Sequence, residues 1–273
     1  MKSIIKRLLI CCVIGFFSSV QAQPLVLGIV PQQSAKKLAR LWTPICTYLS
    51  EKVGHEIRFS TASDIPTFEK RVLEGQYDIA YMNPYHYTVF HERPGYEAIA
   101  KQKNKKIKGI IVVSKDSPLT SLNELDGSTL AFPAPAAFAA SVLPRAKMAK
   151  DGINITPKYV SSHDSVYLTV SRNLFPAGGG VQRTLNNTAP EVSKKLRILW
   201  TTPGYTPHAI ATHPDLDIKL KNKLQKALIE MNKDPEGQAL LKSISFNGIE
   251  IAKDKDWDDV RDLNITLLEH LLK

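Results

Sequence analysis

The sequence is poor in cysteine. Cys11 and Cys12 lie close to the N-terminus, inside the one long hydrophobic run, so Cys46 is the only cysteine in the rest of the chain. An internal disulfide is therefore excluded after this run. Cys46 falls beside the apolar stripe of a predicted amphipathic helix. We expect a buried core side chain there rather than a catalytic or redox thiol.

The hydrophobic run itself has the pattern of a secretory signal peptide. It has a basic start (residues 2–7), an apolar segment (8–17) and a cleavage site of small residues (20–22). The apolar segment is shorter than the ~20 residues that a spanning helix needs. A lipoprotein signal that uses Cys11 or Cys12 is the alternative, but neither cysteine follows the small residue that this processing requires. We predict cleavage after Ala22 and a location in the periplasm.

Motifs for metal binding and covalent catalysis are missing as well. The sequence has no His-x-x-x-His or Cys-x-x-Cys pair and no G-x-S-x-G nucleophile elbow. Residues 178–183 are rich in glycine but lack the Gly-Lys-Ser/Thr ending of a phosphate-binding loop. Three glycines there would instead let the backbone approach a ligand or the other lobe closely. We therefore predict no enzyme, no metal and no cofactor.

Charge is biased toward the basic side. Lys and Arg number 36 against 26 Asp and Glu, which gives a net charge of +10. Three of the basic residues lie in the predicted signal peptide, which we also call the leader. The basic residues are scattered, so we expect no nucleic-acid partner. The densest cluster, residues 101–108, is interpreted as a solvated loop. A positive surface field favours small anions as ligands.

Strand-like and helix-like segments alternate through the chain after the leader. A first series has strands at 24–30, 56–61 and 77–81, with helices at 35–53, 65–74 and 85–92. A second begins with a strand at 129–132, a helix at 136–150 and a strand at 158–161. Extended runs at 108–114 and 208–212 join the series, and predicted helices at 216–232, 235–243 and 257–272 follow. This order predicts an α/β fold of two lobes, residues 23–110 with 212–273 and residues 111–211, connected by two hinge-crossing strands.

Polar residues follow several predicted strands, where α/β folds bind ligands. The segment 81–87 provides Tyr81, Asn83, Tyr85 and Tyr87, either for a ligand or for packing between the lobes. Ser162 or Asp164 is expected to cap a helix and to direct His163 into the cleft; a catalytic triad is the weaker alternative, because neighbours in sequence rarely face one another. Four further candidate ligand-binding residues are chosen from their predicted place in the cleft: Gln32, Arg183, Tyr205 and His208. For Arg183, a position on the surface is the alternative.

The start of the predicted helix at 136–150 has no capping side chain. Residues 133–138 read Pro-Ala-Pro-Ala-Ala-Phe, although the first amide groups of a helix have no partner inside it. Such a start can hold an anion through its amide groups.

In several segments the chain resembles the periplasmic substrate-binding proteins of phosphate, phosphite and phosphonate ABC transporters. The segments are GIVPQQSAKKLARLWTPICTYLSEKVG, EGQYDIAYMNPYHY, LNELDGSTLAF, LPRAKMAKDGI and SSHDSV, in family order. The resemblance implies a two-lobed type II periplasmic-binding-protein fold that closes on its ligand and docks on a permease in the inner membrane. In the phosphonate binders a Ser-Thr-Ser run opens the helix; Ala137, Phe138 and Ala139 stand there in this chain, which predicts a changed ligand preference.

We therefore expect a monomeric solute-binding protein of an ABC importer, with a small oxyanion or organic anion as ligand. A sensory or partner-binding module that regulates a membrane receptor is the alternative. Genes for a permease and an ATPase nearby would favour the first, and a histidine kinase or cyclase gene the second.

Overall fold

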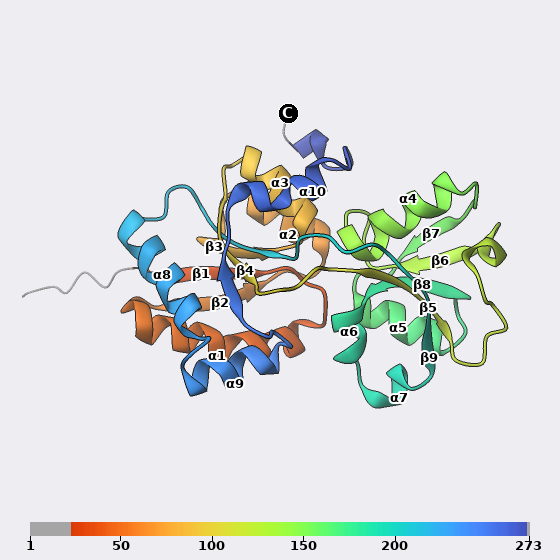
Figure 1. Ribbon diagram of the computed structural model, residues 1–273, viewed down its shortest axis with the longest axis horizontal. Coiled ribbons are helices and arrows are strands. Elements are labelled where there is room, and N and C mark those ends of the chain that lie inside the picture. The colour runs from red at the N-terminus through yellow and green to blue at the C-terminus, as the bar shows by residue number, and fades with distance from the viewer. Residues whose placement is uncertain (1–22, 272–273) are drawn as a thin grey trace, which may run out of the picture.

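The computed structural model describes residues 23–271, which form two α/β lobes side by side (Figure 1). The first lobe contains a six-stranded sheet with the order β11-β4-β10-β3-β1-β2, and the second a five-stranded sheet with the order β7-β6-β8-β5-β9. The predicted signal peptide and its cleavage site lie outside the described residues.

The strands and helices of the first lobe come from both ends of the chain. Its strands are β1 (Leu25–Ile29), β2 (Ile57–Thr61), β3 (Ile79–Met82), β4 (Glu97–Gln102), β10 (Ala209–Thr212) and β11 (Ile249–Ile251). Its helices are α1 (Ala35–Val53), α2 (Ile65–Leu73), α3 (Pro84–Glu92), α8 (Ile218–Glu230), α9 (Pro235–Ser243) and α10 (Asp258–Arg261). Short 3₁₀ turns cover Asp254–Trp257 and Glu269–Leu271.

The second lobe is continuous in sequence. Its strands are β5 (Gly109–Ser114), β6 (Thr129–Phe132), β7 (Thr156–Tyr159), β8 (Ala177–Val181) and β9 (Leu196–Thr201). Its helices are α4 (Leu143–Lys150), α5 (His163–Ser171), α6 (Gln182–Asn186) and α7 (Pro190–Ser193), with a 3₁₀ turn at Leu122–Leu125 and a π-helical turn at Phe138–Val142.

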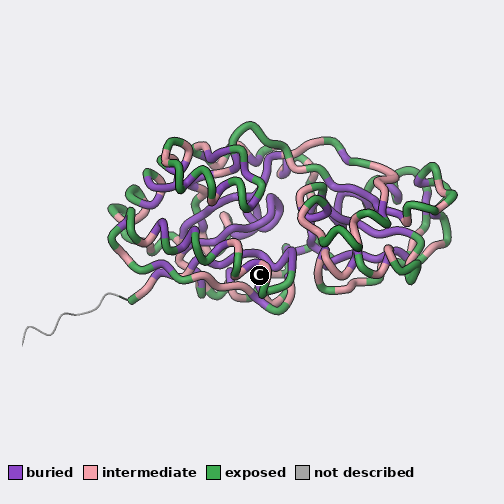
Figure 2. The backbone as a smooth tube through the Cα atoms, turned by 90° about the horizontal axis from the view of Figure 1, so that it is seen from below, coloured by how far each residue is buried: buried purple, intermediate pink, exposed green. Residues whose placement is uncertain are grey.

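Each lobe has its own apolar interior. Strands β1, β2 and β3 run parallel, and β10 inserts antiparallel between β3 and β4. Strands β1, β3 and β10 are largely buried, and the tube in Figure 2 shows buried stretches inside both lobes. Cys46 on α1 is 2% exposed, which confirms the predicted core position, and burial raises the pKa of its thiol to about 12.

The chain passes twice between the lobes, in residues 103–108 and 202–208, which we call the crossing segments. They lie side by side, because the amide groups of Ile107 and Tyr205 each donate to the other residue's carbonyl, at 2.7 and 3.0 Å. The extended runs predicted at the crossings are β5 and β10, which belong to the sheets. Each crossing lies just before one of them.

The π-helical turn packs against glycines of the second sheet. A Cβ atom at Gly109 would stand 1.8 Å from the carbonyl oxygen of Ala139, and one at Gly179 would stand 1.9 Å from that of Ala140. These two positions therefore admit only glycine while the turn stays in place. At Gly179 the close approach is to the π-helical turn of the same lobe, and not to the other lobe as predicted.

Several predicted elements differ from the structure. The helix expected over 136–150 begins as the π-helical turn, and the helix expected over 257–272 ends after α10, because Asn264 adopts a left-handed backbone with φ of 48°. The edge strand β11 and its neighbour β4 were not predicted, since neither has a strongly alternating pattern. Among residues 23–271 no helix is long and apolar enough to cross a membrane.

Candidate functional site

The lobes meet around a small cavity, which we call the interlobe cavity. Its volume is about 10 Å³, the space that a single water molecule needs. Seven of the twelve predicted site residues line it: Gln32, Asn83, Ala137, Phe138, Ala139, His163 and His208.

Gln32 joins both lobes at this cavity. It follows β1 in the first lobe, and its Oε1 accepts a hydrogen bond of 2.6 Å from Arg183 of the second lobe. Its backbone carbonyl accepts a second one, at 3.1 Å, from the amide of His163. A charge-assisted bond of this kind is stronger than one between neutral groups. Gln32 thus accepts two hydrogen bonds across the cleft.

His208 is held neutral beside Gln32. Since Oε1 of Gln32 accepts from Arg183, its Nε2 must donate to Nε2 of His208, 2.9 Å away. That nitrogen is therefore unprotonated. Burial, and next the positive charge of Arg183, lower the pKa of His208 well below its ordinary value, in agreement with this assignment.

His163 is the second neutral imidazole of the site. It is 2% exposed at the start of α5, and Nδ1 lies 3.2 Å from the hydroxyl of Thr184. Burial, and next Arg183, lower its pKa to about 3. Both rings therefore act as neutral hydrogen-bonding groups and not as cations at neutral pH.

Ser162 caps α5, as predicted, by accepting a hydrogen bond of 3.1 Å from the amide of Ser165. Oδ2 of Asp164 accepts from the amide of Ser34, at 3.3 Å, and so faces the first lobe. His163 contacts Thr184 and neither of these side chains. No serine–histidine–aspartate chain is formed, and the capping interpretation is the one that the geometry fits.

The start of the second lobe's π-helical turn forms another wall. Ala137 precedes the turn without a capping bond, and the first amide groups of such a turn have no acceptor inside it. Phe138 is buried, and its ring meets that of Tyr205 edge-on at 5.5 Å. The wall therefore combines amide donors with an aromatic surface, and contains no hydroxyl from residues 137–139.

Asn83 ends β3 and caps α3. Its Oδ1 accepts from the amide of His86 at 2.8 Å, while Nδ2 donates across the cleft to the carbonyl of Ala136, at 3.2 Å. Nε2 of His86, which is fully buried, lies 2.9 Å from Oε1 of Glu69 on α2. This pair fixes the start of α3, and with it Asn83.

The substitution Asn83→Ala is expected to lower the free energy of unfolding of the first lobe by about 1 kcal/mol, as loss of a helix cap does. It also removes a bond between the lobes, so small-angle scattering should show a larger radius of gyration. Asp64→Ala is the matched control, since Asp64 caps α2 through Thr67 at 2.8 Å and touches only its own lobe. An equal change of radius in both variants would contradict the assigned role of Asn83.

Tyr81 and Arg183 form an aromatic and cationic wall beside the cavity. The guanidinium carbon of Arg183 lies 6.0 Å from the ring centres of both Tyr81 and Phe246. The ring of His208 stacks on Tyr81 at 4.9 Å. Among residues 23–271 no carboxylate lies within ion-pair distance of Arg183. Its positive charge is therefore oriented by cation–π contacts and by Gln32 alone. Phe246, in the loop before β11, was not predicted, because its segment shows no site-like pattern.

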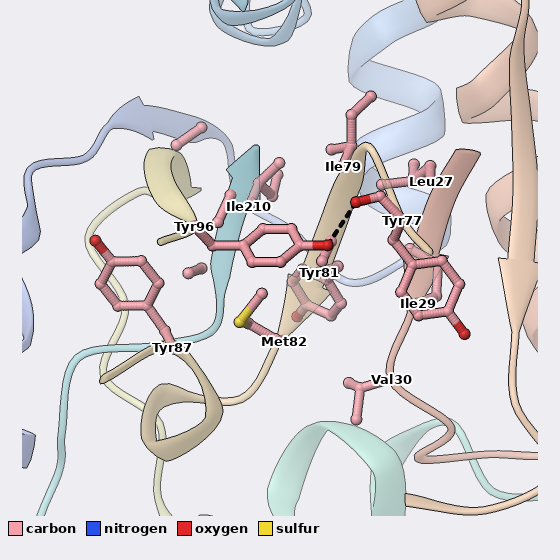
Figure 3. Close-up of a cluster of buried hydrophobic side chains, with 14 of the residues drawn as sticks. Leu27, Ile29, Val30, Tyr77, Ile79, Tyr81, Met82, Tyr87, Tyr96 and Ile210 are labelled. Carbon is pink, nitrogen blue, oxygen red and sulfur yellow. Dashed lines mark hydrogen bonds between the residues drawn. The ribbon is translucent and has the colours of Figure 1, made fainter. Parts of the chain in front are cut away.

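Tyr85 and Tyr87 do not reach the cavity, contrary to prediction. The hydroxyl of Tyr85 accepts from the amide of Leu268, at 2.8 Å, and that of Tyr87 donates to Asp254, at 2.9 Å. Figure 3 shows Tyr87 on α3 apart from Tyr81 on β3. On helix α3 both tyrosines point toward the C-terminal segment, where their hydroxyl groups meet Leu268 and Asp254. They pack within the first lobe.

The cluster of basic residues is largely an exposed loop, as predicted: residues 103–106 and 108 are exposed, and residues 103–106 form a turn and an irregular stretch. Lys101 lies in β4 and pairs with Asp256 at 2.9 Å and Glu250 at 3.1 Å, and Lys106 pairs with Asp259 at 2.9 Å. The rest of the cluster forms the first crossing segment. Within the described part of the chain, no group of three or more His, Cys, Asp or Glu side chains is placed to hold a metal ion.

The chain matches known proteins along most of its length. The sequence profile of the family "ABC transporter, phosphonate, periplasmic substrate-binding protein" matches residues 27–257. The phosphonates-binding periplasmic protein of Escherichia coli K12 is 21% identical over 266 residues, which cover 89% of this chain and 76% of that protein.

Two solved structures share the fold. The binding protein component of an ABC phosphonate transporter from Pseudomonas aeruginosa superposes with a TM-score of 0.82 at 19% identity, covering 89% of this chain and 86% of that one. PhnD1 from Prochlorococcus marinus, in complex with methylphosphonate, superposes with a TM-score of 0.80 at 18% identity, covering 88% and 98%. Both support the type II periplasmic-binding-protein fold, and the profile match shows that the chain belongs to the family of periplasmic substrate-binding proteins of phosphonate ABC transporters.

Proposed function

We propose that this protein binds a small oxyanion, of the phosphonate, phosphite or phosphate type, between its lobes and delivers it to an inner-membrane permease. The family implies a small ligand, a permease partner, a periplasmic location and a binding rather than a catalytic role. Cleavage of the leader after Ala22 and a monomeric state belong to the proposal.

The observation that carries the proposal is the set of hydrogen-bond donors around Arg183. Its guanidinium has five N–H groups, of which one has a protein acceptor, Gln32. Residues of the π-helical turn, whose first amide groups have no acceptor inside it, line the adjoining interlobe cavity. Because His163 and His208 are neutral and buried, the positive charge of Arg183 beside the cavity is left to be balanced by an anion.

The ligand is expected to enter after the lobes separate about the two crossing segments. The interlobe cavity holds about one water molecule, so opening must precede binding of any larger anion. On closure the anion would replace Gln32 as the acceptor for Arg183 and restore a bridge between the lobes. Without hydroxyl groups at residues 137–139, the guanidinium and amide groups would carry the recognition.

A thermal-shift panel on residues 23–273 tests the proposal, with phosphate, phosphite, methylphosphonate, sulfate, methanesulfonate, acetate and benzoate at matched ionic strength. A ligand at ~100 times its dissociation constant should stabilise the protein by ~2.7 kcal/mol, a shift of a few degrees. Stabilisation by phosphorus oxyanions supports the proposed class. Stabilisation only by sulfonates or carboxylates, or by none of these, contradicts it.

The substitution Arg183→Ala is expected to weaken binding of the stabilising anion by about 10- to 100-fold, because a hydrogen bond to a charged group contributes ~1.5–3 kcal/mol. Isothermal titration calorimetry measures the change. Arg172→Ala is the control, because Arg172 is exposed at the end of α5 and its replacement removes the same charge from the protein. Equal affinities in the two variants would show that Arg183 does not bind the anion.

A further inference from the structure

A second, larger recess lies beside the interlobe cavity, against the crossing segments. We call it the hinge groove. It has a volume of about 600 Å³, within the range of ligand pockets. Three residues, Ile107, Val181 and His208, line both spaces, so the groove adjoins the cavity. Gln32 lines the cavity and Arg183 lines the groove, so the hydrogen bond that Arg183 donates to Gln32 joins the two spaces.

The lining of the hinge groove is cationic. Lys105, Lys106, Lys108 and Arg183 line it, together with uncharged residues and no Asp or Glu. Lys106 is neutralised by Asp259, 2.9 Å away. Within residues 23–271 neither Lys105 nor Lys108 has a carboxylate at ion-pair distance. Two lysines and Arg183 therefore leave an unbalanced positive potential inside a concave wall, which attracts anions more strongly than a flat surface does.

The groove is formed by both lobes and a crossing segment. Lys105 and Lys108 lie in the first crossing segment, Arg183 in α6 of the second lobe, and Asn247 in the loop before β11 of the first lobe. An anion there would contact both lobes and the hinge at once. Binding in the groove is thus coupled to the closed arrangement.

We propose that the hinge groove is a subsite for a second anionic group, and that the preferred ligand is an extended organic dianion. One end, the oxyanion, occupies the interlobe cavity; the other, such as a carboxylate, reaches Lys105 and Lys108 past Arg183. This inference rests on the proposed function and narrows its ligand class. The hinge groove would hold the part of such a ligand for which the interlobe cavity has no room.

Two compounds test the inference: methylphosphonate, and 2-carboxyethylphosphonate, which carries a carboxylate in addition to its phosphonate group. Both are titrated by calorimetry at the same ionic strength. The wild-type protein is expected to bind 2-carboxyethylphosphonate about tenfold more tightly, since partly exposed ion pairs contribute up to ~1 kcal/mol each. In the double variant Lys105→Ala/Lys108→Ala this difference should disappear, with little change for methylphosphonate. The difference should also shrink as sodium chloride is added.

The matched control is Lys194→Ala/Lys195→Ala, which removes two exposed lysines beside α7, away from the groove, and so the same net charge. It should keep the tenfold difference. Two results would overturn the inference: equal affinity of the wild type for both compounds, or an unchanged difference in affinity in Lys105→Ala/Lys108→Ala. In either case, binding of methylphosphonate would still uphold the proposed function. If neither compound binds, the inference falls, and the anion panel decides separately on the proposed function.

Discussion

Replacing Gly179 by alanine is expected to destabilise the second lobe by about 3 kcal/mol or more, the upper range for overpacking a core. The new Cβ would stand 1.9 Å from the carbonyl oxygen of Ala140 and 2.6 Å from the ring of Phe132. The carbonyl belongs to the backbone, so the whole π-helical turn must move to relieve the contact. Urea unfolding, followed by circular dichroism, measures the loss.

The displacement would also reach the interlobe cavity, because Ala137 precedes that turn, Phe138 and Ala139 belong to it, and all three line the cavity. Gly152→Ala is the control. Gly152 has a φ of 75° but no atom within 4 Å of the added Cβ, so its cost is the ~1–2 kcal/mol of a left-handed residue. A loss at Gly179 no larger than that at Gly152 would show that the turn does not depend on the close approach.

Acid is expected to destabilise the protein through His163. In the folded state burial, and next Arg183, lower the pKa of this imidazole from 6.5 to about 3. Between these pH values the unfolded chain binds a proton that the folded chain does not. Stability from the neutral ring is thus fully present above pH 6.5 and is lost as the pH falls toward about 3. The loss between about pH 7 and about pH 4 should be about 3 kcal/mol.

Denaturant unfolding at both pH values measures this loss, and His163→Gln should reduce it. His208 contributes in the same direction, since burial also lowers its pKa. Carboxylates titrate over the same interval in both proteins, so the difference between wild type and variant isolates His163. His270→Gln, at an exposed position, is the control and should behave as the wild type. An unchanged loss in His163→Gln would contradict the assignment.

The contacts of residues 137–139 give a physical reason for the absence of hydroxyl groups at these positions. In the structure this stretch packs closely on glycines of the second sheet and places Phe138 against Tyr205. Affinity for an anion must then come from Arg183 and the amide groups. Because binding then depends on Arg183 and the amide groups, the cationic hinge groove beside the cavity would influence which anion is preferred.

The sequence by itself determined the alternating α/β pattern, the core position of Cys46, the cap at Ser162 and most of the residues that line the cavity. These follow from local periodicity, capping chemistry and the rule that polar residues after parallel strands face the cleft. The rule holds for Asn83 and His163, because each lies at the first turn after a strand.

Only the tertiary structure decided which of these residues meet. Tyr85 and Tyr87 share a segment with Tyr81 but face away, since helix α3 rotates each successive side chain by about 100°. The contact of Gln32 with Arg183 joins positions 151 residues apart, and Lys105 acquires its place only because two crossing segments pair beside α6. Distances of this kind depend on how the lobes pack, which local patterns do not encode.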